Sequence, residues 1–195
     1  MAEQVEKLVK VYKNTKVDAQ MLKDADVDAV ILAIGSSPIT IKLEGMDKLQ
    51  HASAPEVLRH EVCPKGKVAV IGGGLVGLET ADTLATDGCD VTVLEMKDEI
   101  GSDLGSLRKI AVMMKLQQMQ VKMLPNSKVC KFTEEGIVLE DETLVPCNCA
   151  VFAVGFASND SHLLVEECEK RTDSVPRDRR RKIRKTCSGC DRGRI

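Results

Sequence analysis

The feature that most constrains the fold is a glycine run set between an apolar segment and a helical pattern. Residues 67–95 read KVAVIGGGLVGLETADTLATDGCDVTVLE. The segment VAVIG predicts a buried strand, LVGLETADTLATDG predicts a helix closed by Gly88, and DVTVLE predicts a second strand. Strand, helix and strand joined by short links require a parallel sheet with a right-handed crossover, so the sequence predicts an α/β fold.

The segments around this unit extend the same sheet. We expect a further helix at about 104–119, a third strand in VKML, and an antiparallel meander over 127–155. The further helix is expected to place five apolar residues mainly on one side: Leu107, Ile110, Ala111, Met114 and Leu116. Residues 27–35 predict another buried strand, and residues 36–66 a connection with one short helix near 54–60. The predicted fold is Rossmann-like.

The glycines have the spacing of a dinucleotide-binding turn. Gly72, Gly74 and Gly77 form G-x-G-x-x-G between a strand and a helix, and Glu95 ends the next strand. Gly72 permits the tight turn, Gly74 lets the backbone approach a pyrophosphate at the helix N-terminus, and Gly77 allows close helix–strand packing. Glu95 is expected to accept hydrogen bonds from the adenine ribose, which favours NAD(H) over NADP(H). The alternative is a glycine-rich corner that binds no ligand.

The first turns of the helix complete the predicted cofactor site. Leu75, Val76 and Glu79 follow or flank the last two glycines of the motif. We include them with Gly72, Gly74, Gly77 and Glu95 as cofactor-binding residues.

No set of side chains predicts catalysis, so the catalytic residues are unknown, and no metal site is predicted. The histidines fall in predicted loops or on exposed helix surfaces: His51, His60 and His162. Cys147 and Cys149 are spaced as a redox pair, but alternation along a strand favours a structural role, with both on one face and one of them buried. Cys187 and Cys190 have the spacing of a redox or zinc half-site without a second pair, and we interpret them as incidental.

Composition and charge narrow the class of protein. Hydrophobic residues make up 43% of the chain and aromatic residues 2%, an aliphatic composition typical of parallel sheets. Eight scattered cysteines, no signal segment and no long apolar run predict a cytoplasmic protein without a membrane span. Residues 1–170 hold 18 basic and 27 acidic side chains, which argues against a nucleic-acid partner. Residues 171–195 hold 10 and 3, so a basic, solvated tail is predicted, and its abrupt composition suggests a shifted reading frame.

Three ordered motifs resemble a known family. GKVAVIGGGLVGLETADTLATDGCDVTVLEMKDEIGSDLG, preceded by DAVILAIGSSP and followed by CAVFAVGFASND, is similar to the C-terminal part of NADH:flavin oxidoreductases of the 2,4-dienoyl-CoA reductase and enoate reductase group. The resemblance covers roughly residues 5–175. It implies an NAD domain inserted into an FAD domain, with Gly35 and Gly155 near the crossings, where the backbone approaches cofactor. It further implies electron flow from NADH through FAD and an iron–sulfur cluster to FMN, which reduces an enoyl thioester or related activated alkene.

The resemblance also implies which parts of such an enzyme would lie outside this sequence. The FMN barrel, the cluster cysteines and the first FAD-binding glycine motif would precede residue 1. We therefore expect a partial FAD-domain remnant and connection at 1–64, the NAD(H)-binding domain at 65–155, and a partial FAD-domain return with a disordered basic tail at 156–195. The expected function is an NADH-binding module of a flavin-dependent oxidoreductase. The alternative is a non-catalytic module that binds NADH and docks to a flavoprotein partner.

Overall fold

The computed structural model describes residues 2–25, 29–159 and 182–185. The chain divides into two compact units. One unit comprises Ser37–Ala157, and the other combines the segments Met1–Ser36 and Ser158–Ile195. Each unit is described by itself.

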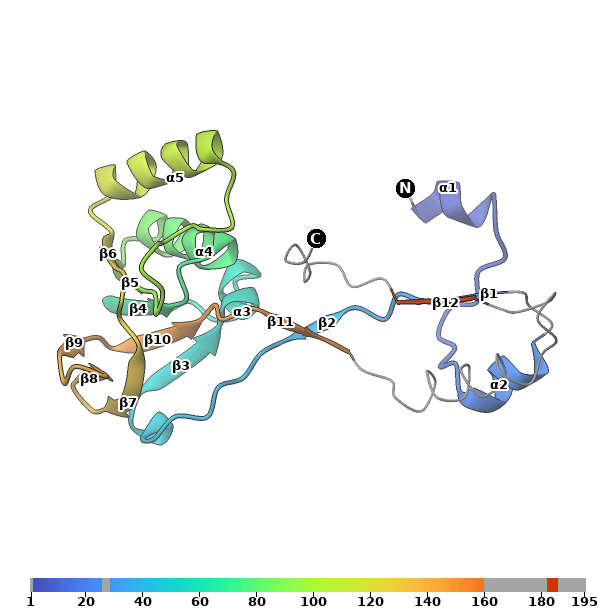
Figure 1. Cartoon of the computed structure of the whole chain (residues 1–195), viewed down its shortest axis with the longest axis horizontal. Coiled ribbons are helices and arrows are strands. Elements are labelled where there is room, and N and C mark those ends of the chain that lie inside the picture. Colours follow the sequence, from blue (N-terminus) through green and yellow to red (C-terminus); the bar gives the residue numbers. More distant parts are fainter. Residues whose placement is uncertain (1, 26–28, 160–181, 186–195) are drawn as a thin grey trace. The chain divides into compact units, whose positions relative to one another are not determined.

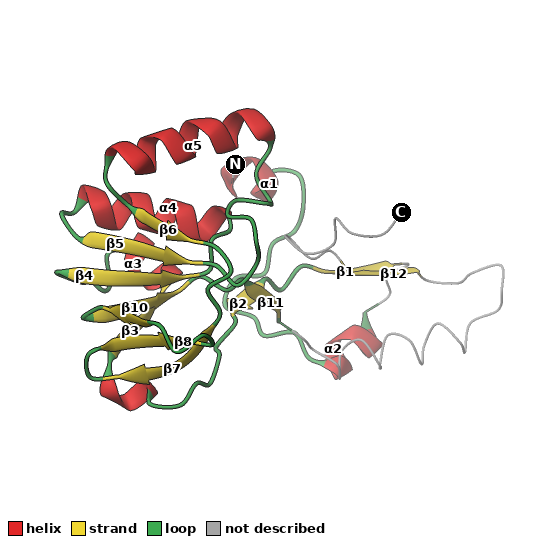
Figure 2. Cartoon of the chain, turned by 60° about the vertical axis from the view of Figure 1, so that its left-hand side comes forward, coloured by secondary structure: helices red, strands yellow, loops and turns green. Residues whose placement is uncertain are grey.

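The larger unit is built on a parallel sheet. In the described part of the chain, five strands lie in the order β3-β10-β4-β5-β6, and every neighbouring pair is parallel (Figure 2). The strand bounds are β3 Gln50–Ser53, β4 Lys67–Ile71, β5 Asp90–Leu94, β6 Lys122–Leu124 and β10 Cys149–Phe152. The central strand β4 buries four consecutive residues, as expected for a parallel strand covered on both faces. The predicted α/β, Rossmann-like class is confirmed.

Helices cover one face of this sheet. They are α3 Ala54–Leu58, α4 Leu75–Thr86 and α5 Ser106–Gln118, and Figure 1 shows α4 and α5 one above the other. Val68, Val70 and Val151 from the sheet pack with Leu78 and Leu84 of α4 in one hydrophobic cluster. The predicted helix end is confirmed, since α4 stops at Thr86 and Gly88 follows with φ +85°.

An antiparallel meander covers the opposite face. It consists of β7 Val129–Thr133, β8 Gly136–Leu139 and β9 Leu144–Pro146. The meander predicted over 127–155 is therefore confirmed only as far as Pro146, because β10 pairs in parallel with β3 and β4. Phe132 and Ile137 of the meander pack with Ala69, Ile71 and Phe152 of the sheet in a second cluster. The central strands β4, β5 and β10 are thus covered on both faces, whereas the edge strands β3 and β6 are partly exposed.

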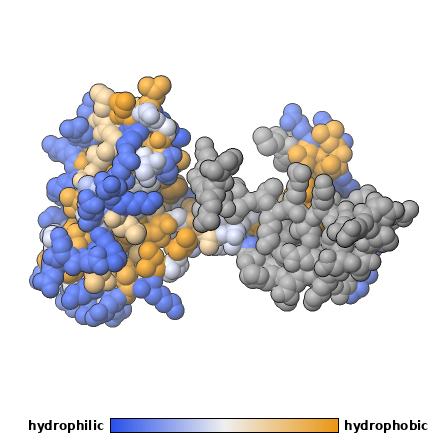
Figure 3. Space-filling model, viewed as in Figure 1, coloured by the Kyte–Doolittle hydropathy of each residue, from blue (hydrophilic) through white to orange (hydrophobic). Residues whose placement is uncertain are grey.

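The prediction that five apolar residues of α5 lie mainly on one side holds for four of them, which are exposed, whereas Leu116 lies on the opposite, inward side. Leu107 is 85% exposed and Ile110 and Met114 are more than half exposed, whereas Leu116 is fully buried. Val112 and Met113 also pack against the core, so the inward stripe contains these two residues and Leu116. Figure 3 shows apolar side chains reaching the surface at the upper end of the unit, where α5 lies. The helix carries two apolar stripes, and hydrophobic period alone does not tell which one faces the sheet.

The connection predicted over 36–66 holds more structure than one short helix. The helix is present as α3, whose Ser53–Glu56 capping box fixes its first turn. A 3-10 turn η1, Met46–Lys48, and strand β3 precede it, and β3 pairs with β10 at the edge of the sheet. Residues 37–64 therefore belong to the same compact unit as the glycine run. The proposed FAD-domain origin of the flanking ranges stays a prediction.

The smaller unit contains α1 Ala2–Glu6, α2 Ala19–Asp24, β1 Ala29–Leu32 and β12 Lys182–Lys185. The predicted strand near 27–35 is present as β1, which pairs in parallel with β12. The prediction that this strand is buried is wrong, since Ile31 is 68% exposed. Strand β12 comprises four residues of the predicted basic tail, and the disorder of that tail stays a prediction. His162, Cys187 and Cys190 lie outside the described residues. Strands β2 Ser36–Pro38 and β11 Phe156–Ser158 pair with each other.

Candidate dinucleotide site

The glycine run forms a tight turn at the carboxyl end of β4. Gly72 has φ +111°, and its N–H donates to the carbonyl of Leu94 at 2.8 Å. A Cβ atom on Gly72 would collide with the carbonyl of Ala153, and one on Gly77 would collide with the carbonyl of Gly72. Both positions therefore admit only glycine without a backbone shift, as the motif requires.

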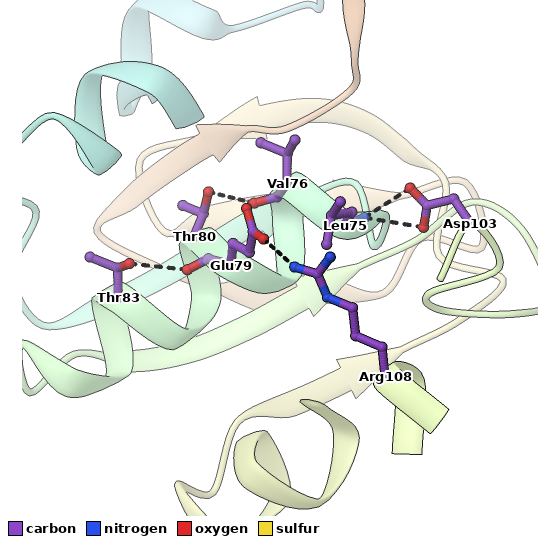
Figure 4. Close-up of polar contacts among 7 residues, drawn as sticks. All are labelled: Leu75, Val76, Glu79, Thr80, Thr83, Asp103 and Arg108. Atoms are coloured by element: carbon purple, nitrogen blue, oxygen red, sulfur yellow. Dashed lines mark hydrogen bonds and ion pairs between the residues drawn. The ribbon is translucent and has the colours of Figure 1, made fainter. Parts of the chain in front are cut away.

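Helix α4 begins directly after this turn, at Leu75. Gly74 is the N-cap residue and offers no side chain to the free N–H groups of the first turn. Asp103, from the loop between β5 and α5, fills that role: its two carboxylate oxygens accept from the Leu75 N–H at 3.1 and 3.0 Å (Figure 4). An oxygen of Asp103 would also lie 3.1 Å from a Cβ atom on Gly74. A negative group thus already sits where the motif would receive a phosphate.

Glu95 lies against the same turn. It follows β5 directly and is half-buried. Its Oε2 accepts from the Gly73 N–H at 2.7 Å and its Oε1 from the Lys97 N–H at 3.0 Å. These two bonds hold the carboxylate beside the glycines, at the position where a ribose-binding acid is expected.

The predicted residues inside α4 point in two directions. The Val76 side chain packs on the core, and its carbonyl accepts from Thr80 Oγ1 at 2.7 Å. Glu79 is exposed and pairs with Arg108 of α5 at 2.9 Å (Figure 4). The structure therefore brings Gly72, Gly74, Gly77, Leu75 and Glu95 together, while Glu79 faces α5.

Gly35 and Gly155 each lie at a bend in the backbone of their own unit. Gly35 has φ +78° and its carbonyl accepts from the Asn159 N–H at 3.0 Å. Gly155 has φ +103° and its carbonyl accepts from the Ile39 N–H at 3.0 Å. A contact with cofactor at these two glycines stays a prediction.

The predicted non-reactive cysteines are buried. Cys147 and Cys149 are both buried and free, which favours a structural role over a redox pair, but they belong to the two opposite hydrophobic clusters. The prediction that both lie on one face is wrong. Burial raises the pKa of each thiol from 9.0 to about 11, so each stays protonated at neutral pH.

A large cavity lies away from the glycine turn. It measures about 640 Å³ and is lined by residues such as Gln50, Cys63 and Cys149. Gln50 and Cys149 begin β3 and β10, so this cavity opens at the amino ends of the strands. Ligands of open α/β sheets bind at the carboxyl ends, where the glycine turn lies.

A family model agrees with this geometry. Residues 2–186 match the model described as pyridine nucleotide-disulphide oxidoreductase. The chain belongs to this family.

Individual relatives are reductases. The chain is 38% identical over 146 residues to bilirubin reductase of Mediterraneibacter gnavus, covering 73% of this chain and 23% of that protein. It is 36% identical over 158 residues to cinnamate reductase of Clostridium sporogenes, covering 77% of this chain and 23% of that protein. The chain thus spans about a quarter of the length of these two relatives.

Solved structures agree on the fold of this family member. A 2-naphthoyl-CoA reductase complex superposes with a TM-score of 0.75 at 23% identity, covering 98% of this chain and 29% of that chain. A ferredoxin reductase of a Rhodopseudomonas palustris system superposes with a TM-score of 0.60 at 22% identity, covering 72% and 37%. This member of the pyridine nucleotide-disulphide oxidoreductase family therefore has the Rossmann-like α/β fold of these structures.

The sequence did not indicate Asp103 as part of the site. It lies eight residues after Glu95 in a loop without a motif, and its position depends on how that loop folds over the turn.

No helix in the part of the chain that the structure describes has the length and apolar character to cross a membrane.

Proposed function

We propose that this chain binds NADH at the glycine turn and forms the nucleotide-binding part of a flavin-dependent reductase. Hydride would pass from NADH to FAD, and the complete enzyme would reduce an enoyl thioester or a related activated alkene. The observation that carries the proposal is the Glu95 carboxylate held 2.7 Å from the Gly73 N–H, beside a turn that only glycine can form.

The residues of the turn fit a dinucleotide. The Leu75 N–H and the backbone of Gly74, which carries no side chain, would hold the pyrophosphate, where the helix dipole favours negative charge. Glu95 would hold the adenine ribose, because its oxygens are fixed by backbone donors and each still has a free lone pair for a hydroxyl. NADH supplies the hydride when bound, while the protein's part is to bind and orient it.

The same carboxylate supports selection of NADH over NADPH. A phosphate on the ribose would meet the negative charge of Glu95, whose position the Gly73 and Lys97 amides restrict. Lys97 and the acidic neighbours Asp98 and Glu99 are all exposed, so the loop presents more negative than positive charge.

The substrate class is inferred from the relatives and from the resemblance. Cinnamate reductase is named for an alkene substrate, and the chain matches 23% of its length. We propose that FMN and an iron–sulfur cluster, like the alkene site, belong to other parts of such an enzyme, or to a flavoprotein partner. A cytoplasmic location fits this role.

A non-catalytic binding module is the second candidate. Among the described residues of the site, the ionisable side chains are carboxylates engaged by backbone amides or by Arg108, and none forms a nucleophile–base pair. A flavin absorbance band in the purified chain would favour the reductase. A colourless chain that binds NADH would favour the module.

The test of the proposed site is a calorimetric titration with NADH and NADPH. The unchanged chain should bind NADH more tightly than NADPH. Glu95→Gln should weaken NADH binding about tenfold and narrow the difference between the two nucleotides, because hydrogen bonds to a charged group contribute about 1.5–3 kcal/mol. Glu99→Gln is the matched control, since it removes a carboxylate of the same loop that pairs with Lys109 instead. No binding of either nucleotide by the folded chain would refute the proposal.

A further inference from the structure

The N-terminus of α4 is already occupied by an anion of the protein itself. Asp103 accepts the Leu75 N–H with both carboxylate oxygens and lies against the face of Gly74 that lacks a side chain. These are the two features that would receive the pyrophosphate of a dinucleotide. One carboxylate and one phosphate cannot both accept the same N–H without bringing like charges into contact.

We propose that Asp103 is a resident competitor of the dinucleotide: its carboxylate caps α4 in the free protein and must leave the Leu75 N–H when the pyrophosphate binds. This inference rests on the proposed function of the turn. It assigns Asp103 a role in setting affinity, because part of the binding free energy of the nucleotide is spent on displacing this side chain.

The loop that carries Asp103 is anchored independently of this contact. The Gly101 N–H donates to the Gly73 carbonyl at 2.7 Å, and the Ile100 side chain is 6% exposed in the core beneath the turn. The Leu104 N–H then returns to the Gly101 carbonyl, which places Asp103 on a tight turn. Asp103 itself is exposed, so its side chain can rotate toward solvent while the loop remains attached.

The negative charge of Asp103 is the reason why we expect this side chain to weaken NADH binding. A carboxylate at a helix N-terminus is stabilised by the free N–H groups and the dipole, and the pyrophosphate is drawn to the same place. With Asp103 present, the incoming ligand meets a negative charge and must replace an existing hydrogen bond. An amide at this position keeps a hydrogen-bond acceptor for the Leu75 N–H and removes the repulsion.

The experiment compares NADH affinities of the 195-residue chain by calorimetry at low salt. Asp103→Asn should bind NADH about threefold to tenfold more tightly than the unchanged chain. Asp103→Ser, which also keeps an acceptor oxygen without charge, should show a gain in the same direction. Asp98→Asn is the matched control, because it removes the same charge from an exposed position earlier in the same loop. Circular dichroism confirms that each variant is folded.

Each result is decisive. A gain in Asp103→Asn with less than a twofold change in Asp98→Asn supports the inference. Equal or weaker NADH binding in both folded Asp103 variants overturns it, and so does an equal gain in Asp98→Asn, which would reflect net charge alone. In these cases the unchanged chain still binds NADH and the proposed function stands. If no folded form of the chain binds NADH, the proposed function fails and this inference fails with it.

Discussion

The absence of a side chain at Gly77 allows α4 to pack closely against the end of β4. Replacing Gly77 by Ala would force a methyl group onto the Gly72 carbonyl, so α4 must move away from β4. We expect Gly77→Ala to lower the free energy of unfolding by about 2 kcal/mol, despite the higher helix propensity of alanine. Chemical denaturation measures this value. Gly105→Ala is the control and should change stability by about 1 kcal/mol at most, because no atom lies within 4 Å of the new methyl group.

The cysteines provide a second test at the scale of residues. Cys63 and Cys130 are exposed, whereas Cys147 and Cys149 are buried with pKa values raised to about 11. At pH 8 a maleimide should label Cys63 and Cys130 within minutes and leave Cys147 and Cys149 intact until denaturant is added. Mass spectrometry of the digested chain identifies the labelled sites. Rapid labelling of Cys147 in the native chain would contradict the buried position.

The same pKa values predict how stability depends on pH. The folded chain holds the protons of Cys147 and Cys149 more tightly than the unfolded chain, where thiols titrate near their ordinary pKa. This contribution to stability is fully present below pH 9 and is lost as the pH rises from about 9 to 11. Unfolding by urea at pH 8 and pH 10 should show a lower midpoint at pH 10, and the Cys147→Ala, Cys149→Ala double variant should show a smaller decrease.

At the scale of elements, the contact between α4 and α5 combines a buried residue with surface ion pairs. Leu116 is fully buried, whereas the Glu79–Arg108 pair lies at the surface with both side chains about half exposed. We expect Leu116→Ala to cost about 2–5 kcal/mol of unfolding free energy and Arg108→Ala less than about 1 kcal/mol. Urea titrations of both variants check the difference. A larger loss in Arg108→Ala would show that the ion pair, and not the core, fixes α5.

Elements with a single apolar pattern were predictable, and those without one were not. The strand–helix–strand unit around the glycines follows from its buried runs and from Gly88. On α5, Leu116 was grouped with the wrong stripe because Leu107 and Met114 match the helical period as well as Val112 and Leu116 do. Strand β3, with the sequence QHAS, has almost no apolar signal because it lies at an edge, and its pairing with distant β10 decides its structure.

In the candidate site, too, the residues placed by local sequence spacing were predictable and those placed by tertiary packing were not. Gly72, Gly77 and Glu95 are predictable because their spacing along the chain fixes their positions around the turn. Asp103 reaches the Leu75 N–H only because Gly101 and Ile100 fold the loop back over the turn. That arrangement depends on tertiary packing, which no local pattern encodes.

At the scale of the whole molecule, the proposed nucleotide site and both hydrophobic clusters lie within one compact unit. The sheet, its covering helices, the meander and the glycine turn all fall within Ser37–Ala157. We expect a chain limited to residues 37–157 to unfold cooperatively and to bind NADH with an affinity within about threefold of that of the full chain. Thermal unfolding and calorimetry test both points. A fragment that is folded but does not bind NADH would contradict this expectation.

The packing around the glycine turn also determines which of its residues can be replaced during evolution without unfolding the protein. Gly72 and Gly77 are required by backbone contacts inside the fold, so they would persist in a lineage that had abandoned its nucleotide. Gly74 faces a movable carboxylate and Glu95 faces solvent in part, so these two positions would be free to drift once selection for binding ceased. A genome survey that infers nucleotide binding from the residues equivalent to Gly72 and Gly77 alone would therefore also count family members that no longer bind the nucleotide. The residues equivalent to Gly74 and Glu95 are the ones to compare.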